Sequence, residues 1–294
     1  MKFMRETPDQ TGIAHSPICR IEGSRVIFGQ DDLAIEEPLE IRLEYGPRNL
    51  RIKQSVSITM RTPGYDFELA VGFLFTEGFV KKRQDVENVQ YCGPELRENP
   101  ITNIVRIELR PDVELDLKKL TRNFYTTSSC GVCGKSSLEA LRTQSGYLSK
   151  HATTPFQAAL IHRMPETLRK AQGIFDSTGG LHASAHMSSK GELLLLREDV
   201  GRHNALDKII GNAFLKDLFP LSSFLLMVSG RASFELIQKA TMAGIGVFAA
   251  VGAPSSLAVE LAKESGMTLL GFVRNERFNI YANESRILFD QGAS

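Results

Sequence analysis

The chain has 294 residues, of which 42% are hydrophobic and 23% are charged. These values exclude a disordered or fibrous chain, and the length suggests two domains. With 35 basic and 34 acidic residues, the net charge of +1 argues against a nucleic-acid partner, because neutralising phosphates needs a basic surplus. No stretch approaches the roughly 20 apolar residues of a membrane span, and the N-terminal residues lack a signal-peptide core. We therefore expect a cytoplasmic protein without a membrane partner.

The first half of the chain predicts a small α+β domain, which we place at residues 16–125. A helix follows the turn RTPGYD, because Leu69, Phe73 and Leu74 have helical spacing and Gly78 is a plausible stop. Around it lie five predicted strands, the first three of which alternate apolar and polar residues, as half-buried antiparallel strands do. The strands are residues 24–28, 38–45, 55–61, 86–91 and 103–109.

The second half predicts a larger α/β domain, at residues 126–294, with a mixed or parallel sheet covered by helices. Residues 192–196 and 223–228 are continuous apolar runs, typical of strands covered on both faces. From the second run onward, strands alternate with helices, and right-handed crossovers turn such a succession into a parallel sheet. The succession is strand 223–228, helix 234–243, strand 246–251, helix 257–264 and strand 268–273.

Two turns of this succession are suited to a phosphate-bearing ligand. Beyond the carboxyl ends of parallel strands, helix N-termini expose unpaired N–H groups and a partial positive charge. The turn SGRAS offers Arg231 as a phosphate partner and Ser233 as a helix cap, while GAPSS offers the hydroxyls of Ser255 and Ser256. Neither turn is a Walker loop or a GxGxxG fingerprint, and helix capping alone explains the serines equally well.

Three further groups of residues could belong to a site. Arg274 and Arg277 follow the last strand of the succession and could grip a pyrophosphate or a guanine edge, or form a solvated basic turn. His203 lies in the charged segment REDVGRHNALDK, where it could act directly or only cap a helix. His182 and His186 could bind a metal only on a helix, whereas the preceding glycines favour a strand or a turn.

A CxxC pair, Cys130 and Cys133, lies in the polar stretch TTSSCGVCGKSS. Structural zinc needs four ligands, and the other two cysteines, Cys19 and Cys92, do not form a second pair. A deaminase zinc pairs PCxxC with an upstream HxE, but none of the 6 histidines is followed by glutamate two residues on. We therefore expect no metal site, and cysteines this sparse do not indicate a disulfide scaffold.

The surroundings of the CxxC pair favour a reactive thiolate. Ser136 and Glu139 match a capping box, so a helix is predicted to begin just after the cysteines. Its N-terminal field and nearby Lys135 would favour the ionised sulfur. A thiolate on a movable loop suits persulfide carriage, in which one cysteine receives a sulfane sulfur and its neighbour assists release by forming a disulfide.

Six segments of the chain resemble the FdhD/NarQ family, the sulfur carriers needed for active formate dehydrogenase. The resemblance covers nearly the whole chain after about residue 20 and departs from the family at Tyr65, where a small acidic or polar residue is more usual. It implies a two-domain α/β protein whose larger domain is cytidine-deaminase-like. The segments are residues 61–78 (RTPGYDFELAVGFLFTEG), 126–137 (TTSSCGVCGKSS), 179–185 (GGLHASA), 198–208 (EDVGRHNALDK), 229–240 (SGRASFELIQKA) and 271–281 (GFVRNERFNIY).

The resemblance also implies a reaction. A cysteine desulfurase would load sulfur onto Cys130, with Cys133 as its helper, and the protein would pass the sulfur to the molybdenum or tungsten bis-guanine-dinucleotide cofactor before that cofactor enters formate dehydrogenase. The family is also expected to form homodimers. Two other functions remain open, a non-catalytic chaperone that delivers the cofactor and a zinc-dependent nucleotide deaminase. The cofactor's guanine dinucleotide end would meet Phe272, Val273, Arg274, Asn275, Glu276 and Arg277.

Overall fold

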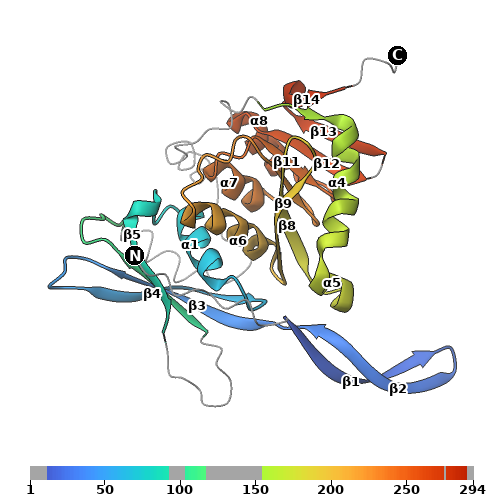
Figure 1. The fold of residues 1–294 in the computed structure, drawn as a ribbon, viewed down its shortest axis with the longest axis horizontal. Coiled ribbons are helices and arrows are strands. Elements are labelled where there is room, and N and C mark those ends of the chain that lie inside the picture. Colours follow the sequence, from blue (N-terminus) through green and yellow to red (C-terminus); the bar gives the residue numbers. More distant parts are fainter. Residues whose placement is uncertain (1–11, 93–102, 117–153, 275, 290–294) are drawn as a thin grey trace.

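A computed structural model describes residues 12–92, 103–116, 154–274 and 276–289 of the chain (Figure 1). None of the helices within these residues has the length and apolar character that crossing a membrane requires. The elements are β1 (Ile13–Glu22), β2 (Arg25–Ala34), β3 (Glu37–Tyr45), β4 (Ile52–Arg61), α1 (Asp66–Thr76), η1 (Arg83–Asp85), β5 (Val86–Tyr91), β6 (Ile104–Leu109), β7 (Phe156–Gln157), α4 (Ala158–Ala171), α5 (Gly173–Thr178), β8 (His182–Met187), β9 (Leu193–Asp199), α6 (Arg202–Leu215), β10 (Leu225–Val228), α7 (Phe234–Met242), β11 (Val247–Ala250), α8 (Ser256–Ser265), β12 (Thr268–Arg274), β13 (Arg277–Ala282), η3 (Glu284–Arg286) and β14 (Ile287–Leu288).

The first sheet has the strand order β4-β3-β6-β5 and carries α1 on its inner face. Strand β3 is antiparallel to β4 and parallel to β6. Its alternate residues Leu39, Ile41 and Leu43 are fully buried, as are Leu69 and Leu74 of α1. The predicted helix and all five predicted strands are confirmed as elements, and four of the strands form this sheet, with their apolar face covered by α1.

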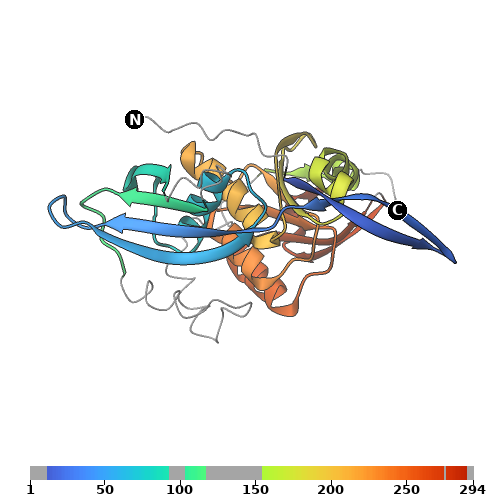
Figure 2. The ribbon, with the colours of Figure 1, turned by 90° about the horizontal axis from the view of Figure 1, so that it is seen from below.

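The strand predicted at residues 24–28 does not belong to this sheet. In the described chain, β2 pairs with β1 along its whole length, from Glu22 opposite Arg25 to Ile13 opposite Ala34. The hairpin projects from the body as a long arm (Figures 1 and 2), and the side chain of Phe28 near its tip is 82% exposed. The prediction of a half-buried strand was wrong here because alternation of apolar and polar residues does not show whether a core covers either face.

The second sheet is a six-stranded mixed sheet of order β13-β12-β11-β10-β8-β9. Strands β10, β11 and β12 are parallel, as predicted, while β8 runs antiparallel to both β9 and β10. Helices α4 and α5 lie on one face, and α6, α7 and α8 lie on the other (Figure 1). Strand β9 was expected to be covered on both faces, but it lies at the sheet edge and leaves Leu194 50% exposed.

The two sheets meet where α1 crosses α6. A buried apolar cluster runs from Ile41 of the first sheet through Leu74 and Ile210 to Phe248 of the second. The helices approach closely because Gly72 of α1 faces the backbone of α6 and Gly211 of α6 faces the backbone of α1. The division into domains near residue 125 stays a prediction, because that segment lies outside the described residues.

Candidate functional site

The predicted phosphate-binding turns lie side by side at the carboxyl edge of the parallel strands. The Gly252 N–H donates to the carbonyl of Gly230 at 3.0 Å, and the Ala232 N–H donates to the carbonyl of Ala253 at 3.1 Å. The end of β12 joins them, because the Phe272 N–H donates to the Gly252 carbonyl at 3.1 Å. The two turns and the segment beginning at Phe272, which were separate candidates in the sequence, therefore form one continuous edge.

The N-termini of α6, α7 and α8 all point to this edge, because each helix follows a strand that ends there. Ser255 caps α8 as predicted, since its hydroxyl accepts from the Ala258 N–H at 3.3 Å. Ser233 occupies the N-cap position of α7 but makes no side-chain cap bond, and its hydroxyl lies 3.5 Å from Nε2 of His203. Helix starts with N–H groups near an open edge favour an anion.

Phe272 has an unusual backbone conformation, with φ at +51°. The left-handed region disfavours large side chains, and such strain is found most often at ligand-binding and active sites. Next to it, a Cβ on Gly271 would lie 2.9 Å from both Pro254 and Tyr281. The backbone of β12 is therefore held tightly against the GAPSS turn at the point where the predicted binding segment begins.

Arg274 and Arg277 face each other across the β12–β13 pair. Both are exposed, and like charges directly opposite on a strand pair repel each other. An anion between the two guanidiniums would relieve this repulsion. Of the other predicted cofactor-binding residues, Phe272 is partly buried, Glu276 is exposed and Val273 has its side chain in the core, while Asn275 lies outside the described residues.

Two histidines stand at the same edge, and both are held neutral. Burial, together with the charges of Lys239 and Arg202, lowers the pKa of His203 to about 4. Its Nε2 lies 3.7 Å from the carboxylate of Glu235. Burial and then Arg202 also lower the pKa of His182. At neutral pH each ring therefore offers one N–H donor and one acceptor nitrogen rather than a positive charge.

The charged segment that contains His203 does not form a single site. Lys208 is buried in an ion pair with Asp199 at 2.7 Å, and Asp207 is buried in an ion pair with Lys239 at 2.9 Å. These pairs bind α6 to β9 and α7 inside the protein. Of this charged segment, Asp207 and Lys208 therefore do not belong to the open edge, since helical spacing turns them toward the interior.

His186, the partner of His182 in the discounted metal pair, lies in the core of the second sheet. Both residues are on strand β8, as the sequence favoured, and the ring of His186 stacks on Phe224 with centroids 5.4 Å apart. Within the described residues, no three His, Cys, Asp or Glu side chains gather in a way that could hold a metal ion. Burial alone lowers the pKa of His186 to about 4.

We expect acid to destabilise the fold through His186. Its folded pKa of about 4 lies below the ordinary value of 6.5, so the unfolded chain takes up the proton first and stability falls as the pH drops from 6.5 to 4. The full loss is on the order of 3 kcal/mol. Urea denaturation at several pH values should show a smaller fall in His186→Phe than in the wild type. The exposed His15→Phe should keep the wild-type fall, and parallel curves for all three proteins would contradict the assignment.

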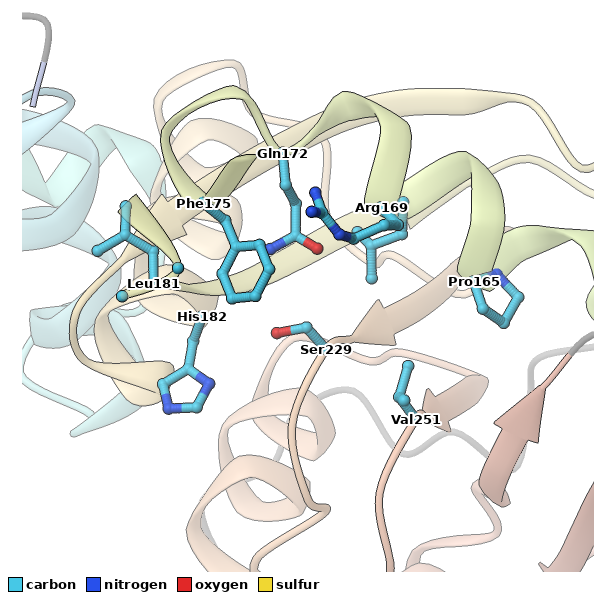
Figure 3. Close-up of a pocket in the computed structure, with 11 residues that line it drawn as sticks. Pro165, Arg169, Gln172, Phe175, Leu181, His182, Ser229 and Val251 are labelled. Atoms are coloured by element: carbon cyan, nitrogen blue, oxygen red, sulfur yellow. The ribbon is translucent and has the colours of Figure 1, made fainter. Parts of the chain in front are cut away.

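A cavity of about 500 Å³ opens at the same edge, between α4–α5 and the ends of β10 and β11 (Figure 3). Ser229 and Val251, which directly follow these strands, form its floor, and His182 lies at one side. Gln172 and Phe175 reach into it from the junction of α4 and α5. The sequence did not predict these last two residues, because they belong to no recognisable motif.

The fold and the site together therefore indicate an α/β protein with a site suited to an anionic ligand at the carboxyl edge of its larger sheet. Residues 34–288 match the FdhD/NarQ family, and the chain belongs to this family. It is 49% identical over 278 residues to the sulfur carrier protein FdhD of Mycobacterium tuberculosis, covering 93% of this chain and 98% of that protein. It is 38% identical over 270 residues to the sulfur carrier protein FdhD of Saccharolobus solfataricus, covering 92% of this chain and 96% of that protein.

The fold also matches a solved structure. The crystal structure of a proposed formate dehydrogenase accessory protein from Desulfotalea psychrophila superimposes with a TM-score of 0.70 at 22% sequence identity. The match covers 94% of this chain and 99% of that chain. The family and the mixed α/β fold expected from the sequence are therefore confirmed. Cys130 and Cys133 lie outside the described residues, so their predicted roles stay predictions.

Proposed function

We propose that this chain is a sulfur carrier that takes a persulfide sulfur from a cysteine desulfurase and transfers it to the molybdenum bis(molybdopterin guanine dinucleotide) cofactor before formate dehydrogenase receives it. The observation that carries the proposal is the 49% identity to a sulfur carrier protein over 98% of that protein's length. The proposal includes a cytoplasmic homodimer and a cytidine-deaminase-like architecture for the larger domain.

The sulfur would move in two steps. The Cys130 thiolate attacks the terminal sulfur of the desulfurase persulfide, so that the donor cysteine leaves as a thiolate and Cys130 becomes a persulfide. The Cys133 thiolate then attacks the inner sulfur, forms a disulfide with Cys130 and releases the outer sulfur as hydrosulfide to the cofactor's metal. Two electrons pass from the two cysteines to the released sulfur, so a cellular thiol must reduce the disulfide before the next cycle.

The cofactor's nucleotide end would lie along the carboxyl edge of the second sheet. Helix starts and the cross-strand pair Arg274 and Arg277 support a pyrophosphate there. The exposed carboxylate of Glu276 could accept the N–H groups of a guanine edge, whereas Val273 could contribute only its backbone. The left-handed backbone conformation of Phe272 also supports a ligand site in this segment, because such strain costs stability and is typical of functional sites.

Sulfur loading tests the proposal directly. After incubation with a cysteine desulfurase and cysteine, mass spectrometry of the intact protein should show the added mass of one or more sulfur atoms. Cys130→Ala should lose this gain, because it removes the accepting thiolate. Cys19→Ala is a matched control, since Cys19 is an exposed free cysteine on the projecting arm, and it should load like the wild type. Undiminished loading of Cys130→Ala would rule out the assignment.

The alternative is a chaperone that binds and delivers the cofactor without carrying sulfur. A nucleotide site at the carboxyl edge of the second sheet is compatible with both functions, so substitution of the two cysteines is needed to distinguish them. If a Cys130→Ala/Cys133→Ala variant restores formate dehydrogenase activity in a strain lacking this protein, the chaperone function is correct. If the same variant fails although it folds and binds nucleotide, the sulfur carrier is supported.

A further inference from the structure

The projecting arm, formed by β1 and β2, has no role in the sulfur transfer proposed above. Within the described chain its two strands pair only with each other, and both views show it leaving the body of the protein (Figures 1 and 2). A ribbon of two strands is at best marginally stable in water, whereas three or more strands with an apolar face are stable. A long two-stranded arm therefore indicates a partner that adds strands to it.

One face of the arm is apolar. Residues directly opposite each other on paired strands share a face, and here Val26 lies opposite Ile21 while Phe28 lies opposite Cys19. Phe28 is 82% exposed, Ile21 62% and Val26 58%. Contiguous exposed apolar side chains of this kind mark an interaction surface. The opposite face carries the charged residues Arg20, Glu22, Arg25 and Asp31.

Strand β2 offers the edge to which a partner strand can bind. The middle of β1 contains Pro17, which has no N–H group to donate to a neighbouring strand. Strand β2 contains no proline from Arg25 to Ala34. A long edge strand without proline presents a row of unpaired N–H and C=O groups, which is a template for pairing with another chain. The partner is therefore expected to add a strand to β2.

The charges of β2 match a second copy of the same strand. Within the described chain, neither Arg25 nor Asp31 has an ion-pair partner, whereas Asp32 is bonded to His15 at 2.7 Å. Two copies of β2 related by a two-fold axis run antiparallel, and each contact then occurs twice. Arg25 and Asp31 are each three residues from Phe28. With Phe28 opposite itself on the axis, Arg25 of each copy lies opposite Asp31 of the other, and opposite charges in such positions attract.

We propose that the arm joins two copies of this chain, with residues 25–31 of one β2 pairing antiparallel with the same residues of the other around Phe28. The two arms then form one four-stranded sheet, and the two Phe28 rings lie side by side in the middle of its apolar face. The inference rests on the proposed function only in its homodimer, for which it names the contact surface. The transfer of sulfur does not depend on it.

An exchange of charges tests the pairing in the full chain. Arg25→Glu and Asp31→Lys each place like charges opposite one another in both pairs, so each variant alone should dimerise at least about tenfold more weakly than the wild type in sedimentation equilibrium. An equimolar mixture of the two variants should recover the wild-type dimer, because in the mixed dimer both pairs again join opposite charges. Arg48→Glu is the matched control, since Arg48 is exposed and distant from the arm, and it should dimerise like the wild type.

A cross-link tests the register independently. Phe28→Cys is made together with Cys19→Ala, because Cys19 lies opposite Phe28 within the same hairpin. Opposed residues of an antiparallel pair have Cβ atoms about 5 Å apart, close enough for a disulfide. Mild oxidation with oxidised glutathione should therefore link two chains of this variant. Ser24→Cys/Cys19→Ala should remain unlinked, since Ser24 lies at the exposed tip and far from its counterpart in this register.

The outcomes separate the inference from the proposed function. A monomeric wild type, a charge variant that dimerises as tightly as the wild type, or a mixture no tighter than its components would each overturn the inference. A monomer that still gains sulfur from the desulfurase would remove only the homodimer from the proposed function. A dimer that forms through the arm but gains no sulfur would support the inference and overturn the sulfur carrier.

Discussion

Gly211→Ala is expected to destabilise the protein by at least about 3 kcal/mol, a large fraction of the 5–15 kcal/mol that stabilises a typical domain. A Cβ at this position would overlap the carbonyl of Glu68 in α1, so the two helices would have to separate. The overlapping atom belongs to the backbone of α1, so it cannot move out of the way without moving the helix, as the end of a flexible side chain could. Because one apolar cluster connects both sheets through these helices, urea denaturation should show a single transition at a much lower urea concentration, or little soluble protein should be recovered.

Gly173→Ala is the matched control, because Gly173 is also helical but a Cβ there would meet no atom within 4 Å. It should leave stability unchanged or raise it by up to about 1 kcal/mol, since alanine favours helix. Gly72→Ala should behave like Gly211→Ala, because its Cβ would overlap the carbonyl of Asp207. If Gly211→Ala denatures like the Gly173 control, the close crossing of α1 and α6 is not present in solution.

The parts of the fold that the sequence predicted are those set by local patterns. The run from β10 to β12 alternates short apolar strands with helices, and the rule of right-handed crossovers then gives the parallel order. The crossing of α1 and α6 could not be predicted in this way. Gly72 and Gly211 each resemble an isolated helical glycine, and their importance depends on a contact between two helices far apart in the sequence. The projecting arm was missed because its alternation is the same as that of a half-buried strand.

In the candidate site too, features set by local sequence could be predicted, whereas features set by packing between distant segments could not. The SGRAS and GAPSS turns and the pair Arg274 and Arg277 could be proposed from sequence, because strand ends and helix starts mark an anion-suited edge whatever the rest of the fold. Lys208 stands equally near a strand end, yet the structure buries it. Gln172 could not be predicted to line the cavity, because its position there depends on how α4 and α5 pack on the sheet.

Lys208→Met is expected to destabilise the fold by about 3–5 kcal/mol, the cost of leaving its partner as an unpaired buried charge. Lys208 is 1% exposed and Asp199 is fully buried, and their side chains meet at 2.7 Å. Lys208 also donates to the carbonyl of Thr62 at 2.9 Å, so it links α6 to the segment that connects β4 and α1. Lys170→Met on α4 breaks an equally short ion pair with Glu166 that is exposed, and it should leave stability nearly unchanged, because water screens such a pair.

A second substitution can show that the buried charge of Asp199 causes the loss. In the wild type, the Gly201 N–H donates to the carboxylate of Asp199 at 2.8 Å. In Lys208→Met/Asp199→Asn, the amide oxygen of the new asparagine can still accept this hydrogen bond, but the negative charge is gone. Urea denaturation should therefore place the double variant between Lys208→Met and the wild type, since the uncompensated charge is removed while part of the hydrogen bonding remains. A double variant no more stable than Lys208→Met would show that the lost bond to Thr62 and the lost packing of the lysine chain, rather than the charge, account for the destabilisation.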